Sequence, residues 1–514
     1  MSGAMIQQII AFVLYLGVMI FVGVKFMKKN RSSEDFFLGG RKMGPWTTAL
    51  SAEASDMSGW LLMGLPGLAY LGGMKEAFWT ALGLGIGTYL SWLIVAKRLR
   101  KCTIVYGNAI TIPEFLNNRF NDKKRILGTV TVLFNILFFT IYVASGFVAC
   151  AKLFNSVFGL EYHVGLVLGL IVILAYTITG GYFAVCTTDF IQGTLMFVAL
   201  LLTGVIMLVT LGGPSAALVK VSEFGEKAMR GDFNAMSEKM QSAFTANQNF
   251  SVTSAISALV WGLGYFGMPH FIIRFMGIRS NREIRVSRRI AVVWVLVALS
   301  VAVIVGALGS VYLQQYLNPP VLNTFAAETV FSETLKAMFP PFIAGIFLCA
   351  ILAAAMSTAD SQLLVASSSF SQDIFKGIIN KKATDKQVLN VSRITVLVVA
   401  LIAFVISLDQ NSSIFSLVSY AWAGFGGTLG PIILLALFWR RTTNAGAVAG
   451  FICAGITVLV WNKIPATVHP IFGVYEILPA FIINLVVTVG VSLCGKKQDP
   501  EVQAKFDEYK SMAD

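Results

Sequence analysis

Residues 51–67 combine polar side chains with helix-weakening residues inside a long apolar segment. Glu53, Asp56 and three serines stand here among three glycines and Pro66. A carboxylate at membrane depth costs at least ~2.5 kcal/mol, so it faces a partner or a wet cavity. The glycines and Pro66 weaken the helix and release backbone carbonyls from their hydrogen bonds. Free carbonyls beside Asp56 indicate a site for a hard cation; the simpler alternative is a glycine-rich packing face.

A second stretch offers neutral oxygens. On a helix, Ala354, Ser357, Thr358 and Ser361 stand at i, i+3, i+4 and i+7, so they share one face. Sodium needs several oxygens with little net charge, and this face supplies part of such a shell. Alternatively, the hydroxyls bond carbonyls of their own helix. We favour the cation site because the two stretches complement each other: one offers a carboxylate and free carbonyls, and the other a face of neutral hydroxyls.

A third stretch, residues 261–270, interrupts another apolar span with three glycines and Pro269. It mirrors the first, because each is the first broken helix of a possible five-helix half, 46–212 and 251–439. Corresponding broken helices in two inverted halves are the best sequence indication of a transporter site. Trp261 and Tyr265 share a helix face and could enclose a small solute, with Tyr142 a weaker candidate for the same cavity. Ordinary interface aromatics are the alternative.

The elements that must position these residues are membrane helices. The chain has 514 residues, of which 56% are apolar and 13% charged, and its mean hydropathy is +0.75, so it is a polytopic membrane protein. Thirteen helices are predicted, at 5–27, 46–73, 76–96, 126–155, 163–183, 187–212, 251–278, 290–316, 336–370, 390–408, 413–439, 443–462 and 474–495.

These windows divide the chain into segments. The first helix and a cytoplasmic loop occupy 1–45, and the two halves are separated by an outer loop at 213–250. Two further helices follow at 440–495, and a cytoplasmic tail at 496–514. The outer loop is predicted either to contain helices lying across the surface or to be a solvated connector. A second outer loop, 317–335, is expected to cap the outer vestibule.

The distribution of basic residues predicts the orientation. With the N-terminus outside and the C-terminus in the cytoplasm, 31 Lys and Arg fall on the cytoplasmic side and eight outside. Topology therefore explains the net charge of +13, and we expect no nucleic-acid partner. The six cysteines and three histidines form no spaced cluster, so the only metal expected is sodium.

The sequence carries none of three common enzyme motifs. It contains no P-loop, no HExxH and no GxSxG in a strand-turn-helix context. We therefore expect neither an enzyme nor an ATP-driven pump. The energy for any transport must come from an ion gradient or from the gradient of the solute itself.

Several motifs in the same order resemble one family. Residues 54–67, 261–270, 355–358 and 418–423 resemble the solute:sodium symporter family, and within it the bacterial sodium/proline symporters; residues 179–185 resemble the family signature. The likeness runs from about residue 5 to residue 495. It implies an all-α, LeuT-type core of two inverted five-helix repeats with extra helices at either end.

The resemblance also implies roles for individual residues. Sodium binding would involve the backbone carbonyls of Ala54, Met57 and Ala354 and the hydroxyls of Ser357 and Thr358. Asp56 would tune or gate this site, supported by Ser55 and Ser58. L-Proline would lie beside Tyr142, Trp261, Tyr265 and Pro269. Arg41 and Asp189 match positions associated with cytoplasmic-side ion coupling; their simpler interpretations are a positive-inside anchor and a solvated loop charge.

Three residues depart from the family pattern. Glu53 and Asp360 are carboxylates where small or neutral residues are expected, and they could modify ion number or solute preference. Met268 replaces a polar residue before Pro269.

The implied activity is sodium-coupled import of L-proline across a bacterial plasma membrane by alternating access. The lipid bilayer, sodium and the solute are the expected partners, with no obligate protein partner. The alternatives are another small carboxylate, vitamin or polyol as cargo, or a non-pumping receptor or channel.

Overall fold

The computed structural model describes residues 2–27, 32–230, 249–313, 327–465 and 467–512. Helices dominate this part of the chain, and its one β-contact is an isolated bridge between Met43 and Ile278. The first half comprises α1 (Gly3–Met27), α2 (Ser33–Leu38), η1 (Gly39–Arg41), α3 (Pro45–Asp56), η2 (Trp60–Gly64), α4 (Leu65–Gly72), α5 (Met74–Leu90), η3 (Ser91–Val95), α6 (Ala96–Val105), α7 (Ile112–Arg119), α8 (Ile126–Phe158), α9 (Tyr162–Gly180), α10 (Tyr182–Thr210) and α11 (Pro214–Arg230).

The second half contains the bent helix pair. It comprises α13 (Val252–Leu259), η4 (Val260–Phe266), α14 (Pro269–Gly277), α15 (Ile284–Tyr312), α17 (Val330–Met338), α18 (Pro341–Ser368), η6 (Ser369–Ile379), α19 (Asp385–Ile406), α20 (Ile414–Phe438), α21 (Asn444–Trp461), η7 (Pro470–Gly473), α22 (Ile477–Cys494) and α23 (Pro500–Ser511).

Long apolar helices make this a multi-pass membrane protein. Within the described residues, ten helices are long and apolar enough to cross a membrane, or eleven if one bent pair counts as a span. Two shorter apolar helices, Trp60–Leu71 and Tyr162–Ala175, fall below that length. The predicted class is confirmed, whereas the predicted count of thirteen is not.

Both predicted helix breaks are present, and local sequence explains each. Helix α3 ends because Met57 adopts a non-helical backbone (φ −80°, ψ 70°), and the chain resumes as the π-helix η2. The second break separates η4 from α14, and the two parts are bent by 42°. Pro269 opens α14, where its missing N–H costs no hydrogen bond and its ring disfavours helix in the preceding residue.

Glycines let η4 lie directly on α5. A Cβ atom added at Gly87 would lie 2.2 Å from the carbonyl oxygen of Gly262, and one at Gly83 would lie 2.3 Å from that of Leu259. Such a backbone approach is possible only without side chains, as at other membrane helix interfaces. It places the broken second helix at a fixed depth, and with it Trp261 and Tyr265.

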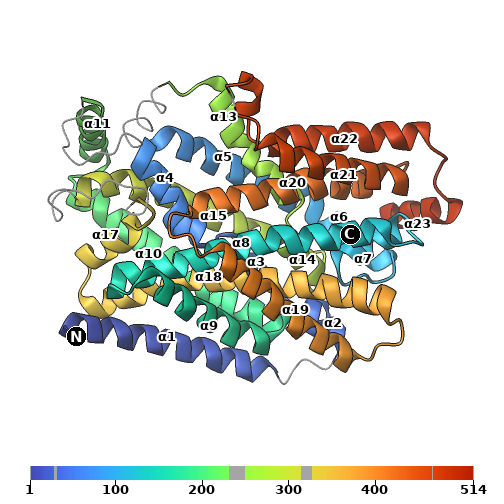
Figure 1. Ribbon diagram of the computed structural model, residues 1–514, viewed down its shortest axis with the longest axis horizontal. Coiled ribbons are helices and arrows are strands. Elements are labelled where there is room, and N and C mark those ends of the chain that lie inside the picture. Colours follow the sequence, from blue (N-terminus) through green and yellow to red (C-terminus); the bar gives the residue numbers. More distant parts are fainter. Residues whose placement is uncertain (1, 28–31, 231–248, 314–326, 466, 513–514) are drawn as a thin grey trace.

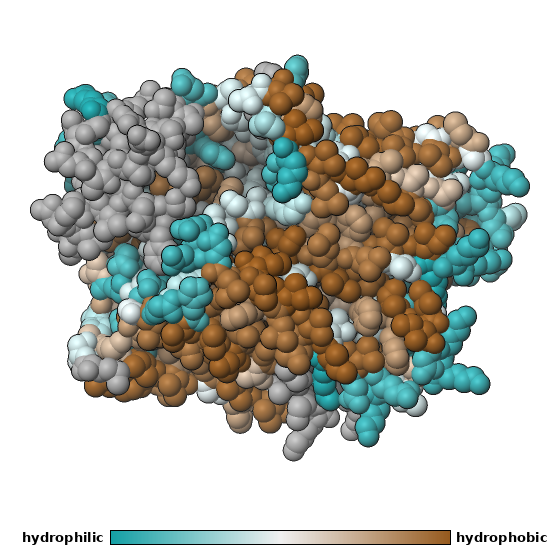
Figure 2. Space-filling model, in the orientation of Figure 1, coloured by the Kyte–Doolittle hydropathy of each residue, from teal (hydrophilic) through white to brown (hydrophobic). Residues whose placement is uncertain are grey.

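The molecule has two polar ends separated by an apolar belt. One end carries α11 and α17 and is called the α17 side; the other carries α2, α7 and α23 and is called the α23 side (Figure 1). Hydrophobic side chains cover the surface between them (Figure 2). The N-terminus lies at the α17 side, and the C-terminal helix at the α23 side (Figure 1).

The loop and tail segments are partly helical. Helix α11 lies in the loop predicted at 213–250, but residues 231–248 of that loop fall outside the described residues. Of the loop predicted at 317–335, residues 317–326 are likewise outside. The tail forms α23, which packs on the body: Tyr106 donates to the carbonyl of Val502 (3.1 Å), and the Arg119 guanidinium lies 4.7 Å from the Phe506 ring centroid.

Candidate functional site

The hydroxyl face of α18 meets the broken end of α3. Ser357 Oγ donates to the carbonyl oxygen of Ala54 (2.7 Å) and lies 3.3 Å from that of Ala354. Thr358 Oγ1 is buried and makes no hydrogen bond within the described residues. The alternative of hydroxyls bonded only to their own helix is therefore wrong for Ser357, which also reaches across to α3.

The oxygen types here suit a small hard cation. Carbonyl and hydroxyl oxygens are uncharged, and the orphaned Thr358 hydroxyl is an available ligand beside them. Met57, whose carbonyl was also predicted as a ligand, stands at the break itself. Ser55 and Ser58 hydrogen-bond to the backbone beside the break: Ser55 Oγ donates to the Ala52 carbonyl (3.1 Å), and Ser58 Oγ accepts from the Trp60 N–H (3.1 Å). Their predicted role in supporting the sodium site stays a prediction.

Asp56 joins the two broken helices. The Tyr265 hydroxyl donates to Asp56 Oδ2 (2.6 Å), and the Tyr142 hydroxyl donates to the Asp56 carbonyl oxygen (3.2 Å). The side chain is almost fully buried, and Oδ1 has no hydrogen-bond partner within the described residues. Asp56 thus connects the cation ligands to the aromatic residues and keeps one free acceptor atom.

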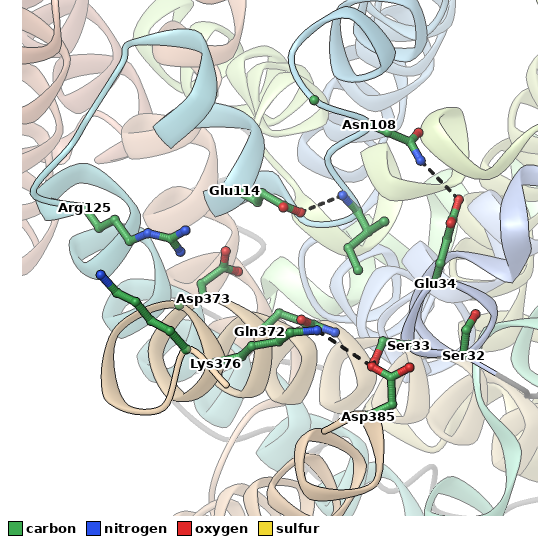
Figure 3. A pocket seen from close by; sticks show the side chains of 14 residues that line it. Ser32, Ser33, Glu34, Asn108, Glu114, Arg125, Gln372, Asp373, Lys376 and Asp385 are labelled. Carbon is green, nitrogen blue, oxygen red and sulfur yellow. Dashed lines mark hydrogen bonds and ion pairs between the residues drawn. The ribbon is translucent and has the colours of Figure 1, made fainter. Parts of the chain in front are cut away.

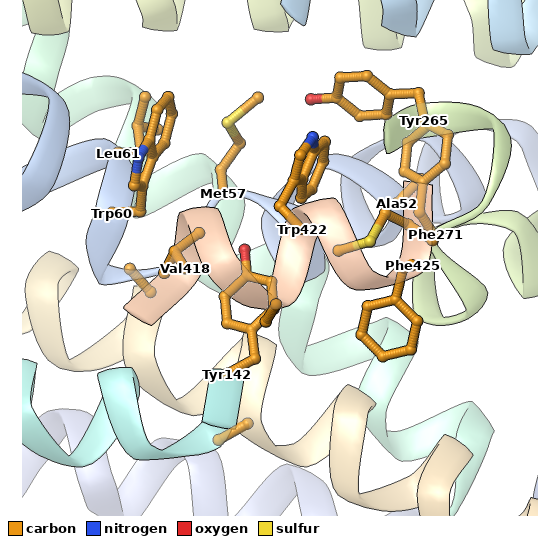
Figure 4. Close-up of a cluster of buried hydrophobic side chains, with 14 of the residues drawn as sticks. Ala52, Met57, Trp60, Leu61, Tyr142, Tyr265, Phe271, Val418, Trp422 and Phe425 are labelled. Atoms are coloured by element: carbon orange, nitrogen blue, oxygen red, sulfur yellow. The ribbon is translucent and has the colours of Figure 1, made fainter. Parts of the chain in front are cut away.

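A small cavity lies against Asp56, and aromatic side chains surround it (Figure 4). Tyr142, Trp261 and Tyr265 line it, as predicted for a solute pocket, whereas Pro269 does not and serves as the first residue of α14. Its volume of about 10 Å³ is too small for an amino acid. The cavity is therefore closed in this conformation.

Trp422 is a cavity residue that the sequence did not identify. Its Nε1 donates to the Trp261 carbonyl (2.7 Å), and its ring meets that of Tyr265 edge-on at 5.1 Å. Two sequence features could have indicated Trp422: it belongs to the motif at residues 418–423, and it packs on a glycine of the 261–270 motif. A Cβ atom added at this glycine, Gly264, would lie 2.0 Å from Trp422 Nε1. Leu84, Trp60 and Val418 line the same cavity.

Stacked aromatic rings separate this cavity from a vestibule on the α17 side. Trp261 stacks on Tyr475 and packs at a tilt against Phe415, with ring centroids 5.2 Å away in each case, and the Trp60 ring centroid lies 5.6 Å from that of Trp261. The vestibule has a volume of about 440 Å³, and Trp261 lines both spaces. Access from the α17 side therefore requires this aromatic layer to separate.

Asp189 is buried and paired, so its interpretation as a solvated loop charge is wrong. Its Oδ2 lies 3.2 Å from Arg274 Nη2 and accepts from Ser51 Oγ (2.6 Å). Arg274 also donates to Ser361 Oγ (2.5 Å) and to the His270 carbonyl. Sequence reasoning missed Arg274 because it counted this residue among the exposed cytoplasmic cations, whereas it is only 1% exposed.

Arg41 makes its hydrogen bonds with other residues than Asp189, on the α23 side. Its guanidinium donates to the carbonyls of Met276 (2.8 Å) and Ala109 (2.9 Å) and to the Asn108 side chain (3.0 Å). Burial lowers the pKa of Arg41 to about 10. Arg41 thus joins the loop before α3 to the ends of α6 and α14, a more specific role than a membrane-surface anchor.

The two unexpected carboxylates are fully buried. Glu53 Oε1 accepts from Trp92 Nε1 (3.1 Å), which directs the side chain toward η3. Asp360 lies on α18 and interacts electrostatically with Arg274 and Tyr15. A modifying role for either carboxylate stays a prediction.

Comparisons with known proteins agree with this geometry. The family model described as "Sodium:solute symporter family" matches residues 36–454. The chain belongs to the sodium:solute symporter family. It is 41% identical over 502 residues to the sodium/proline symporter of Haemophilus influenzae, with 97% of each chain covered. It is 41% identical over 501 residues to that of Escherichia coli, covering 98% of this chain and 96% of the relative.

Solved structures agree on the fold. A Na+-coupled sialic acid symporter in a substrate-bound outward-open state superposes with a TM-score of 0.74 at 21% identity, covering 96% of this chain and 99% of that one. MhsT in complex with L-phenylalanine superposes with a TM-score of 0.52 at 15% identity, covering 86% and 97%. The LeuT-type, all-helical architecture predicted for this family member is thereby confirmed.

Proposed function

We propose that this chain imports L-proline together with sodium by alternating access to the cavity beside Asp56. The observation that carries the proposal is the contact between Ser357 and the Ala54 carbonyl, which brings the hydroxyl face of α18 to the break in α3. Sodium binds there to the carbonyls of Ala54, Met57 and Ala354 and the hydroxyls of Ser357 and Thr358. The relatives named sodium/proline symporters support this cargo.

L-Proline binds in the adjoining cavity once the cavity has widened. The rings of Trp261, Tyr265 and Trp422 offer apolar faces to the pyrrolidine ring, and Tyr142 closes the opposite wall. Asp56 couples the two ligands, because its backbone carbonyl and its carboxylate are held by Tyr142 and Tyr265. Sodium favours the solute-competent state only if it binds that state more tightly, and such coupling is reciprocal.

The α23 side faces the cytoplasm and the α17 side faces outward. The excess of Lys and Arg in the segments of the α23 side supports this orientation, with 31 against eight. Inward movement of one sodium ion then gains about 2.3 kcal/mol per 100 mV of membrane potential. This energy alone concentrates a zwitterion more than about tenfold.

Radiolabelled proline uptake into proteoliposomes tests the proposal. An inward sodium gradient is expected to drive saturable, electrogenic accumulation, and a reversed gradient to drive efflux. Uptake that persists unchanged when choline replaces sodium would contradict the coupling and favour a channel. Failure of excess proline to compete with another solute would assign the same fold a different cargo, such as a small carboxylate, vitamin or polyol.

Two substitutions separate the ion and solute subsites. Asp56→Asn is expected mainly to raise the sodium concentration needed for half-maximal uptake. Trp261→Ala is expected mainly to raise the KM for proline, because it removes a wall of the cavity. Equal effects of both variants on both parameters would argue against two distinct subsites.

A further inference from the structure

A second and larger cavity opens on the α23 side, away from the central site (Figure 3). Its volume is about 710 Å³, within the range of small-molecule sites. Its walls come from α2, from the segment leading into α7, from the start of α8 and from η6. None of the predicted sodium or solute residues lines it.

An unusual helix forms one wall. Residues Ser369–Ile379 are an eleven-residue π-helix, a form that is rare and is found frequently at functional sites. It presents Gln372, Asp373, Lys376 and Gly377 to the cavity. The widened turn is therefore placed where it shapes this cavity.

The fold fixes a guanidinium in the cavity with no hydrogen-bond partner in the described part of the chain. Arg125 precedes α8 in a left-handed conformation (φ 54°), and a Cβ atom added at Gly377 would lie 2.1 Å from Arg125 Nη1. The Arg125 side chain makes no hydrogen bond or ion pair within the described residues. Gln372 Nε2, on the adjacent wall, is buried and also lacks an acceptor there. The Arg125 guanidinium and the Gln372 amide thus both line the cavity with unused hydrogen-bond donors, and the buried amide is costly unless a ligand binds it.

Carboxylates complete the site. Glu114 accepts from the Ile110 N–H through Oε2 (2.9 Å), and its carboxylate lines the cavity. Arg125 interacts electrostatically with both Glu114 and Asp373. Of the residues lining the cavity, Arg125, Lys376 and Lys381 are basic and four are acidic. This near balance disfavours a polyanion and favours a ligand that carries both charges.

We propose that this cavity binds a small zwitterionic amino acid, with its carboxylate on Arg125 and Gln372 and its ammonium on Glu114. Guanidinium–carboxylate pairing is among the strongest charge-assisted interactions. The identity of the ligand as L-proline, the released cargo, rests on the proposed function. Binding here is independent of sodium, because no sodium ligand lines the cavity.

Equilibrium binding of radiolabelled L-proline to the purified full-length protein, with and without sodium, tests the proposal. Wild-type protein is expected to show one sodium-dependent and one sodium-independent class of site. Arg125→Gln is expected to weaken the sodium-independent class at least about tenfold while leaving the sodium-dependent class unchanged. Arg285→Gln, an exposed arginine at the start of α15 that lies outside the cavity, is the matched control.

Two further measurements separate the ligand site from a structural role. Gly377→Ala keeps the charge but displaces the guanidinium, so it is expected to weaken the same class of site. Pyrrolidine and acetate each carry one of the two charges and are expected to displace proline much less well than proline itself does.

The possible outcomes are distinct. Sodium-dependent binding alone, with wild-type behaviour of Arg125→Gln, would overturn this site and leave the proposed function intact. If the wild-type protein shows neither sodium-dependent proline binding nor sodium-dependent uptake, the proposed function itself would be overturned. If acetate displaces the sodium-independent proline as well as unlabelled proline does, the site does not require a zwitterion and binds a simple carboxylate.

Discussion

Two buried ion pairs lie on opposite sides of the central cavity, and they join different parts of the molecule. On the α17 side, Lys152 of α8 pairs with Glu328 at 2.5 Å, and Glu328 also accepts from the Ile414 N–H at the start of α20. On the α23 side, Arg274 of α14 pairs with Asp189 of α10 at 3.2 Å. Both pairs are at most 4% exposed.

The two ion pairs differ in the helices that they connect. The Lys152–Glu328 pair attaches the segment before α17 to two intact helices. The Arg274–Asp189 pair attaches both broken helices to α10 and α18, because Arg274 belongs to α14 and also donates to Ser51 of α3 (3.1 Å). With both pairs formed, the cavity between them is closed. We infer that release of the first opens the α17 side, and release of the second frees the moving helices on the α23 side.

Removing Arg274 is expected to have the largest effect. Arg274→Gln leaves Asp189 buried without its cation, which costs about 3–5 kcal/mol. We expect proline uptake to fall to background and the thermal unfolding temperature to drop. Arg274→Gln combined with Asp189→Asn is expected to recover much of the stability but not the transport. Wild-type uptake by the single variant would contradict a role in coupling the broken helices.

Weakening the pair on the α17 side is expected to have an intermediate effect. Glu328→Gln removes the negative charge but retains an acceptor for the N-terminus of α20. We expect this variant to favour opening toward the α17 side. A cysteine at position 418, which lines the cavity, should then react with an externally added thiol reagent about tenfold faster, equivalent to roughly 1.4 kcal/mol. An equal labelling rate of this cysteine with and without Glu328→Gln would show that the pair does not control opening toward the α17 side.

Breaking an exposed ion pair is expected to have the smallest effect, and it serves as the control for the two buried pairs. Arg440 and Asp507 approach to 2.6 Å, yet their side chains are 51% and 54% exposed. Solvent screening limits such pairs to about 0–1 kcal/mol. Arg440→Gln is therefore expected to leave uptake and thermal stability nearly unchanged. If Arg440→Gln reduces uptake as much as Arg274→Gln does, burial does not determine the relative importance of the ion pairs, and α23 is itself essential for transport.

Much of the central site could be predicted from local sequence. The break at Met57, the one before Pro269 and the hydroxyl face of α18 follow from residues close together in the chain. The Arg274–Asp189 pair could not be found in this way, because its members are 85 residues apart. An arginine near a helix end is also indistinguishable, by sequence alone, from a residue at the membrane surface.

Other features depend on packing that composition does not reveal. Trp422 enters the cavity because Gly264 leaves room for its ring, and that contact spans two distant helices. The tail was predicted only as a cytoplasmic segment, without a helix. Its few apolar residues, Val502, Phe506 and Tyr509, become buried only against other segments of the α23 side. Sequence therefore located the helix breaks better than it located the partners that close the site around them.

The sodium dependence of proline transport in Ser357→Ala, with Thr358→Val beside it, tests the central claim most directly. If these hydroxyls and the Ala54 carbonyl hold the ion, the sodium concentration for half-maximal uptake should rise at least about tenfold. The KM for proline at saturating sodium should stay close to that of the wild type. Unchanged sodium activation in both variants would contradict a cation site between α18 and the broken α3.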